Sequence, residues 1–141
     1  MSRDSIVVQS MSDWDKVVSA LSAKLRGKNL FLLEGDLGAG KTTLVGLIAK
    51  KLNIPMVSSP TFSLIQQHRN LIHVDLYRLE SMEEIDATGF WEIFEDEDAM
   101  VFVEWSSKIS DDLWPLDWDI TKITINKKSD NEREVLIETV S

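Results

Sequence analysis

A glycine-rich segment from Gly35 to Thr42 is the part of the 141-residue chain whose residue types and spacing point most directly to chemistry. It matches the pattern G-x-x-x-x-G-K-[ST] in full. Glycines let the backbone curl so that its N–H groups face a phosphate, and a following helix adds a favourable dipole. Lys41 is expected to reach the β- and γ-phosphates of a nucleotide, and Thr42 to offer its hydroxyl to Mg²⁺. The residues predicted to bind the nucleotide here are Asp36, Leu37, Gly38, Ala39, Gly40, Lys41, Thr42 and Thr43.

Two apolar runs, residues 71–74 and 100–103, each end on an acid, Asp75 and Glu104. A phosphate-binding loop needs carboxylates at the ends of neighbouring strands to hold Mg²⁺ and to orient the attacking water. Without a metal, a carboxylate about 4 Å from a phosphate charge would be repelled by about 4 kcal/mol at an effective dielectric constant near 20. The site therefore implies Mg²⁺, with Asp75 and Glu104 as candidate catalytic and metal residues. Which of the two contacts the metal directly is left open.

Three further residues could belong to the site, but their sequence patterns are less specific than those of the loop and the two acids. Thr61 lies in Ser59-Pro60-Thr61, after the first strand and helix, where a switch segment would sense the γ-phosphate; an ordinary turn is the alternative. His73 lies between Ile72 and Val74, a pattern typical of a hydrogen-bonded structural histidine. Trp105 follows Glu104, where core packing and nucleotide contact are both possible.

The surrounding periodicity predicts the elements that position these residues. Helical spacing covers Trp14 to Leu25, with Ser12 or Asp13 as the cap and Gly27 as the stop. The other expected elements are a strand at 30–33, a helix at 44–52, a hairpin of 62–67 and 71–76, a helix capped by Ser81 and ending near Ala87, an apolar segment at 90–94 after Gly89, a strand at 100–103, and strands at 119–125 and 134–140 around a turn at 127–131. This order predicts a single α/β domain over residues 1–141, a three-layer P-loop fold with a central mixed sheet, helices on both faces and antiparallel edge strands.

Composition narrows the function classes. The absence of Cys excludes disulfide scaffolds, thiol nucleophiles and Cys-based metal sites. The N-terminal residues resemble no signal peptide and no apolar run is long enough for a membrane span, so we expect a soluble cytoplasmic protein. A net charge of −9 argues against tight direct binding of nucleic acid.

The acidic excess is concentrated in one stretch. Residues 75–104 hold 11 acids and one base, Arg78. Its ends, Asp75 and Glu104, are the candidate metal residues. Its middle, residues 80–98, is predicted to be an exposed acidic surface that docks a partner or keeps RNA away; a merely solvated face is the alternative.

Four motifs occur together in an order that resembles the TsaE (YjeE) family of bacterial ATPases. They are the loop Gly35–Thr43, Ser59-Pro60-Thr61-Phe62, His73-Val74-Asp75-Leu76-Tyr77-Arg78-Leu79 and Val103-Glu104-Trp105. The resemblance implies a P-loop ATPase that serves tRNA N6-threonylcarbamoyladenosine modification. Such a protein would bind the complex of TsaD, which performs the transfer, with TsaB, reset that complex by ATP hydrolysis, and meet tRNA only indirectly.

The resemblance also implies roles for single residues. They are phosphate binding by Lys41 and its loop, Mg²⁺ binding by Thr42 and Glu104, a second functional acid at Asp75, the switch threonine at Thr61 and the nucleotide-side aromatic at Trp105. Arg133 loosely matches an arginine near the nucleotide, although Asp130-Asn131-Glu132 before it departs from the family's Gly-Arg pattern.

Two other functions use the same motifs. A small-molecule kinase shares the loop, lysine and magnesium, but it generally needs an arginine-bearing lid, and the five Arg here form no cluster. A nucleotide-gated interaction module would bind ATP with little turnover. Because no arginine finger is evident near the loop, we expect weak intrinsic ATPase activity that partners stimulate.

Overall fold

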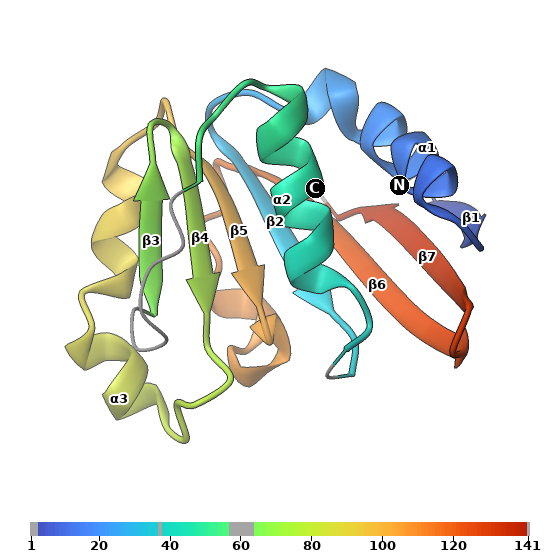
Figure 1. The fold of residues 1–141 in the computed structure, drawn as a ribbon. Coiled ribbons are helices and arrows are strands. Elements are labelled where there is room, and N and C mark those ends of the chain that lie inside the picture. Colours follow the sequence, from blue (N-terminus) through green and yellow to red (C-terminus); the bar gives the residue numbers. More distant parts are fainter. Residues whose placement is uncertain (1–2, 37, 57–63, 141) are drawn as a thin grey trace.

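A seven-stranded mixed sheet forms the centre of the molecule, in the order β1-β7-β6-β2-β5-β4-β3 (Figure 1). The computed structural model describes residues 3–36, 38–56 and 64–140. The strands are β1 (Arg3–Val8), β2 (Asn29–Glu34), β3 (Ile65–His68), β4 (Leu71–Asp75), β5 (Met100–Glu104), β6 (Asp119–Ser129) and β7 (Glu132–Thr139). The helices are α1 (Met11–Leu21), α2 (Lys41–Lys51) and α3 (Met82–Ala87), with 3₁₀ turns η1 (Ser22–Lys24), η2 (Phe90–Glu95), η3 (Ser106–Lys108) and η4 (Asp111–Leu113).

The middle of the sheet is parallel, and this places the functional strand ends together. Strand β2 pairs in parallel with β5 and β6, and β4 pairs in parallel with β5. The pairs β1–β7, β6–β7 and β3–β4 are antiparallel, as the predicted antiparallel edges require. In this register Leu33 and Asp75 both pair with Glu104, so β2, β4 and β5 end level with one another. The loop between β2 and α2 lies at that same edge (Figure 1).

Both faces of the sheet are covered, which confirms the predicted three layers. Helices α1 and α2 pack on one face, where Val17, Leu44 and Ile48 join Phe31 and Phe102 in a buried cluster. On the other face α3, η2 and the loop that contains Trp114 and Trp118 cover the strands. Trp114 and Trp118 of that loop are each only 3% exposed, so the loop folds back on the core.

The structure corrects several predicted boundaries. Strand β1 was not expected; most of its residues are exposed at the sheet edge, so no alternating apolar pattern marks it. Helix α1 begins at Met11 after Ser10, which replaces Ser12 or Asp13 as the N-cap, and it ends at Leu21, where η1 continues the chain. Residues 57–63 lie outside the described part, so only the β3 portion of the first hairpin strand can be compared.

The last hairpin is also tighter than predicted. Strand β6 continues to Ser129 through an irregularity between Lys127 and Ser129, and β7 begins at Glu132. Pairing of Ser129 with Glu132 leaves only Asp130 and Asn131 between the strands.

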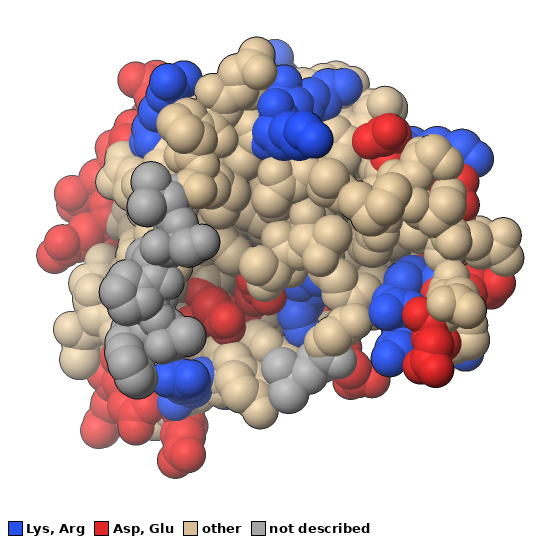
Figure 2. Space-filling model, viewed as in Figure 1, with Lys and Arg blue, Asp and Glu red and all other residues tan. Residues whose placement is uncertain are grey.

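The acidic stretch is exposed as predicted. Acidic side chains gather along the edge of the molecule that carries α3 and the segment after it (Figure 2). The exposed acids between residues 80 and 98 are Glu80, Glu83, Glu84, Asp86, Glu92, Glu95, Asp96, Glu97 and Asp98. Ser81 caps α3, because its side chain accepts a hydrogen bond from the Glu84 N–H at 3.2 Å. Within the described residues, no helix has the length and apolar character needed to cross a membrane.

Candidate nucleotide-binding site

The loop from β2 to α2 needs glycine at two positions for steric reasons. Gly35 has φ 153° and Gly40 has φ 117°, conformations that residues with a side chain rarely adopt. A Cβ on Gly35 would lie 2.5 Å from the Ile125 carbonyl oxygen, and one on Gly40 would lie 2.8 Å from the Trp14 ring. The motif glycines therefore allow the loop to pass close to β6 and α1.

Lys41 begins α2 and is only 5% exposed. Its Nζ donates hydrogen bonds to the carbonyl oxygen of Gly35 and, at 3.5 Å, to that of Asp36. The same atom lies 3.9 Å from the centroid of the Trp105 ring, a cation–π distance. Burial lowers the pKa of Lys41, although the nearby carboxylates oppose that change. The loop thus holds a cation at its centre, on the side where the strand-end acids lie.

Glu104 connects β5 to the loop. Its side chain is 3% exposed, and its Oε2 accepts a hydrogen bond from Thr42 Oγ1 at 2.9 Å. The same oxygen lies 2.5 Å from His73 Nε2. Burial alone would raise the pKa of Glu104, but the contact with His73, the bond from Thr42 and the charge of Lys41 outweigh it and hold that pKa below its usual value. Glu104 is therefore an ionised carboxylate in contact with the loop's threonine.

Asp75 lies beside Glu104 but has different contacts. Its carboxylate is half-buried, and Oδ1 accepts a hydrogen bond from the Tyr77 N–H at 3.0 Å. The Tyr77 ring lies 5.0 Å from the ring of Trp105. Asp75 thus stabilises the turn after β4 that brings an aromatic side chain to the site.

Trp105 is held in an uncommon backbone conformation, with φ 61° in the left-handed region. The next residues are anchored to the end of β2, because Glu34 Oε1 accepts hydrogen bonds from Ser107 N and, at 3.3 Å, from Ser106 Oγ. This arrangement directs the Trp105 ring over Lys41. Strain of this kind is found at functional sites when surrounding contacts maintain it.

These groups surround a cleft of about 230 Å³. Its lining consists of Gly38, Ala39, Gly40, Lys41, Thr42, Thr43, Asp75, Tyr77, Glu104 and Trp105. The structure therefore brings together most of the predicted site residues. Asp36 adjoins the cleft through its contact with Lys41, whereas Leu37 and Thr61 lie outside the described residues, and their roles stay predictions.

The oxygen donors of the cleft fit Mg²⁺ bound together with a nucleotide. Nowhere in the described ranges do three or more His, Cys, Asp or Glu side chains form a group that could hold a metal ion. Mg²⁺ needs no such cage, since it is usually held by one or two protein oxygens, substrate phosphates and water. The Thr42 hydroxyl and the Glu104 carboxylate, 2.9 Å apart, supply hard oxygen ligands of that kind.

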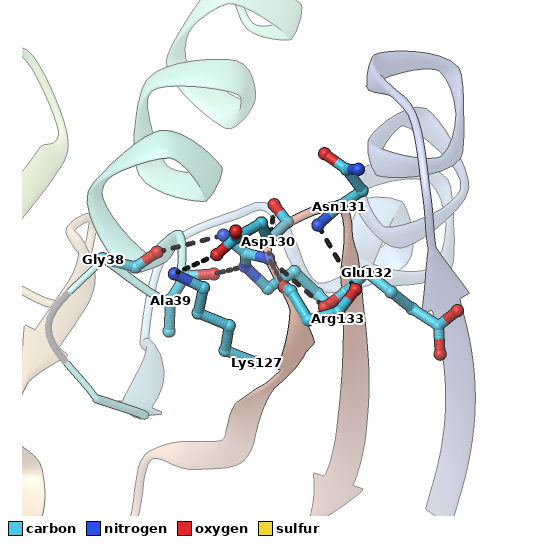
Figure 3. Close-up of polar contacts among 8 residues, drawn as sticks. Gly38, Ala39, Lys127, Asp130, Asn131, Glu132 and Arg133 are labelled. Atoms are coloured by element: carbon cyan, nitrogen blue, oxygen red, sulfur yellow. Dashed lines mark hydrogen bonds and ion pairs between the residues drawn. The ribbon is translucent and has the colours of Figure 1, made fainter.

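Arg133 reaches the loop from the start of β7, and its side chain points toward Gly38 and Ala39 (Figure 3). Its Nε donates to the Ala39 carbonyl oxygen at 3.0 Å, and its terminal nitrogen donates to that of Gly38 at 3.3 Å. Another nitrogen donates to Ser129 O at 2.8 Å. Arg133 therefore fastens the hairpin to the phosphate loop, while its predicted contact with the nucleotide stays a prediction.

A second cleft of about 350 Å³ adjoins the loop on the Arg133 side. Residues 8–11, Trp14, Asp130, Asn131 and Arg133 line it together with Gly38, Ala39, Gly40 and Thr43. None of these N-terminal residues was predicted to belong to the site. The helical pattern marked Trp14 only as a core residue, because contact with Gly40 depends on how α1 crosses the sheet.

Comparison with known proteins agrees with the motifs. The family model described as "Threonylcarbamoyl adenosine biosynthesis protein TsaE" matches residues 8–135. The chain is 34% identical over 131 residues to the tRNA threonylcarbamoyladenosine biosynthesis protein TsaE of Bacillus subtilis, covering 89% of this chain and 79% of that protein. It is 44% identical over 97 residues to the Nostoc protein of that name, covering 63% of this chain and 59% of that protein.

A solved structure gives the same result for the fold. The crystal structure of Bacillus subtilis YdiB matches with a TM-score of 0.75 and 25% identity, covering 99% of this chain and 87% of that chain. The P-loop α/β fold expected from the sequence is therefore confirmed. With the family model matching most of the sequence, the chain belongs to the TsaE family of threonylcarbamoyl adenosine biosynthesis proteins.

Proposed function

We propose that this protein is a Mg²⁺-dependent ATPase that supports tRNA N6-threonylcarbamoyladenosine modification. The observation that carries the proposal is the 2.9 Å hydrogen bond from Thr42 of the phosphate loop to the buried carboxylate Glu104. This contact places the loop's hydroxyl and a strand-end acid at one point, beside Lys41. That combination is what nucleotide hydrolysis at a P-loop requires.

Each group of residues in the cleft would have a different role in nucleotide hydrolysis. The N–H groups of the loop and the dipole at the N-terminus of α2 favour binding of the phosphates, and Lys41 places a positive charge beside the phosphates. A bound Mg²⁺ would neutralise charge on the phosphates, held by Thr42 and Glu104. Asp75 borders the same cleft and is available to orient a water molecule. Trp105 and Tyr77 reduce solvent access beside Lys41, which strengthens the electrostatic interactions there.

The second cleft is the proposed place for the nucleoside end of ATP. It shares Gly38, Ala39, Gly40 and Thr43 with the first cleft, so a nucleotide can extend from one to the other. Trp14 offers an aromatic surface there, and Asn131 an amide. These are groups on which a base can stack or form hydrogen bonds.

The biological role is proposed from the family. The relatives named above are tRNA threonylcarbamoyladenosine biosynthesis proteins, although the matched region spans only 59% of the Nostoc protein. We propose that the chain acts in the cytoplasm on a TsaD–TsaB complex and resets it by ATP binding and hydrolysis. The net charge of −9 supports contact with tRNA only through that complex.

Nucleotide binding tests the site directly. Lys41→Ala should weaken ATP binding strongly, because it removes the buried charge of the loop. Lys50→Ala is the matched control, since Lys50 is an exposed lysine near the other end of the same helix. Equal affinity of both variants for ATP, measured by calorimetry, would refute the assignment.

Phosphate release separates the proposed function from its alternatives. We expect slow release by the isolated protein and faster release with TsaD and TsaB, together with ATP-dependent pull-down of both. Acceleration by a small-molecule acceptor would instead indicate a kinase. ATP-dependent partner binding without turnover would indicate an interaction module.

A further inference from the structure

His73 is a buried polar side chain that the chemistry described so far does not use. It lies on β4, two residues before Asp75, and is 8% exposed. Its register partner on β5 is Phe102, two residues before Glu104. Side chains two apart on a strand share a face, so His73, Asp75 and Glu104 all lie on the side of the sheet that α2 covers.

The contact between His73 and Glu104 has a defined direction. Nε2 lies 2.5 Å from Glu104 Oε2, the oxygen that also accepts the Thr42 hydroxyl. An ionised carboxylate only accepts hydrogen bonds, so Nε2 carries the hydrogen in either charge state of the ring. One carboxylate oxygen is thus fixed from two directions, by a strand residue and by the phosphate loop.

We propose that His73 is a positioning residue that holds the Glu104 carboxylate against Thr42, in the orientation that receives a metal-bound nucleotide. The inference rests on the proposed function. A glutamate side chain has three rotatable bonds, and without His73 the carboxylate of Glu104 could turn toward Lys41. Hydrogen-bonding partners of metal-binding side chains typically alter metal affinity or activity by about 10- to 100-fold.

The test measures metal binding apart from hydrolysis. Mn²⁺, followed by electron paramagnetic resonance, is titrated into protein saturated with a non-hydrolysable ATP analogue. His73→Leu keeps apolar bulk and removes the donor, whereas His73→Gln places an amide N–H near the position of Nε2. Ile72→Val is the matched control, a change to a buried neighbour on the opposite face of β4.

We expect His73→Leu to weaken Mn²⁺ binding about 10- to 100-fold, His73→Gln to recover most of that loss, and Ile72→Val to resemble wild type. Analogue binding without metal should change less than about twofold, because the phosphate loop itself is unaltered. A purely structural role would lower the unfolding temperature and metal-free analogue binding together. Unchanged Mn²⁺ binding in folded His73→Leu would overturn the proposal.

Two further outcomes are decisive. If His73→Leu does not fold, His73→Gln is compared with His73→Asn, whose shorter amide does not reach Glu104. Weaker Mn²⁺ binding by His73→Asn than by His73→Gln supports the proposal. Equal Mn²⁺ binding by these two variants overturns it. If wild-type protein itself binds neither analogue nor Mn²⁺, the proposed function fails. A different result, in which wild type binds the analogue and Mn²⁺ and the His73 variants bind Mn²⁺ equally well, overturns only the proposal for His73.

Discussion

Strands β4 and β5 both end on an acid, and these acids are register partners, yet their surroundings differ. Glu104 at the end of β5 is buried and bonded to His73 and to Thr42 of the phosphate loop. Asp75 at the end of β4 is half-buried and bonded to the backbone of its own turn. Two similar sequence patterns thus give one carboxylate that is hydrogen-bonded to the phosphate loop and one that is hydrogen-bonded to a neighbouring turn.

The position of each strand in the sheet explains the difference. Strand β5 is adjacent to β2, whose end leads into the phosphate loop, so the longer Glu104 side chain reaches Thr42. Strand β4 is one place further away, and Asp75 is shorter by one methylene group. From this comparison we propose that Glu104 is the acid that would contact a bound metal directly, and that Asp75 would act on water or on the Tyr77 turn.

The largest effect is expected from Glu104→Gln. The substitution keeps size but removes the charge that would bind Mg²⁺ beside Thr42. Metal-dependent ATP binding and phosphate release should both fall by about 100-fold or more, since a direct ligand matters at least as much as its hydrogen-bonding partners. Calorimetry with and without Mg²⁺ is the measurement, and ATP binding in EDTA is the control that should persist. Retained Mg²⁺-dependent turnover would remove the proposed role of Glu104.

A smaller metal effect is expected from Asp75→Asn. The amide oxygen can still accept the bond from the Tyr77 N–H, so the turn should keep its shape. We expect Mg²⁺ affinity in the nucleotide complex to change by less than about tenfold, and phosphate release to fall more than that affinity does. If Asp75→Asn weakens Mg²⁺ binding as much as Glu104→Gln does, the two acids are equivalent and the comparison fails.

The sequence predicted the positions of both acids but not this division between them. An apolar run followed by an acid marks a strand end, and it does so equally for Asp75 and Glu104. The difference depends on strand order and on the contact with His73, which is 31 positions from Glu104 in the sequence. No local pattern encodes such a pairing, so His73 could be interpreted only as a structural histidine.

The phosphate loop was the most predictable part of the site, because glycine, lysine and threonine at fixed spacing determine its local conformation. Its supports were less predictable. Arg133 was expected near the nucleotide, but its contacts with Gly38 and Ala39 depend on a hairpin more than 90 positions away in the sequence. Strand β1 was missed since an exposed edge strand carries little hydrophobic alternation.

Arg133→Ala tests the opposite side of the loop from the two acids. Loss of the bonds to Gly38 and Ala39 should weaken ATP binding by about tenfold or less, equivalent to about 1.4 kcal/mol or less. Mg²⁺ affinity in the nucleotide complex should stay near wild type, because Arg133 does not contact Glu104 or Thr42. Arg133→Lys is the matched control. It keeps the positive charge, but its ammonium group cannot reproduce the two hydrogen bonds that the guanidinium makes to the carbonyl oxygens of Gly38 and Ala39. A specific loss of Mg²⁺ affinity in Arg133→Ala would show that the two sides of the loop are coupled.

The smallest expected effect is in the pH dependence of stability. The folded state holds the pKa of Glu104 below its ordinary value of 4.5. A depressed carboxyl pKa stabilises the folded protein above the ordinary pKa, and this contribution disappears as pH falls through the folded value. The free energy of unfolding of wild type minus that of Glu104→Gln should therefore decrease as pH is lowered below about 4.5. Urea unfolding, followed by tryptophan fluorescence between pH 7 and pH 3, measures the free energy of unfolding of each protein. Subtracting one from the other cancels the contributions of groups that titrate alike in both proteins. A difference that grew with acidification would mean that the fold destabilises the Glu104 charge, and the interpretation of its contacts with His73 and Thr42 as stabilising would be wrong.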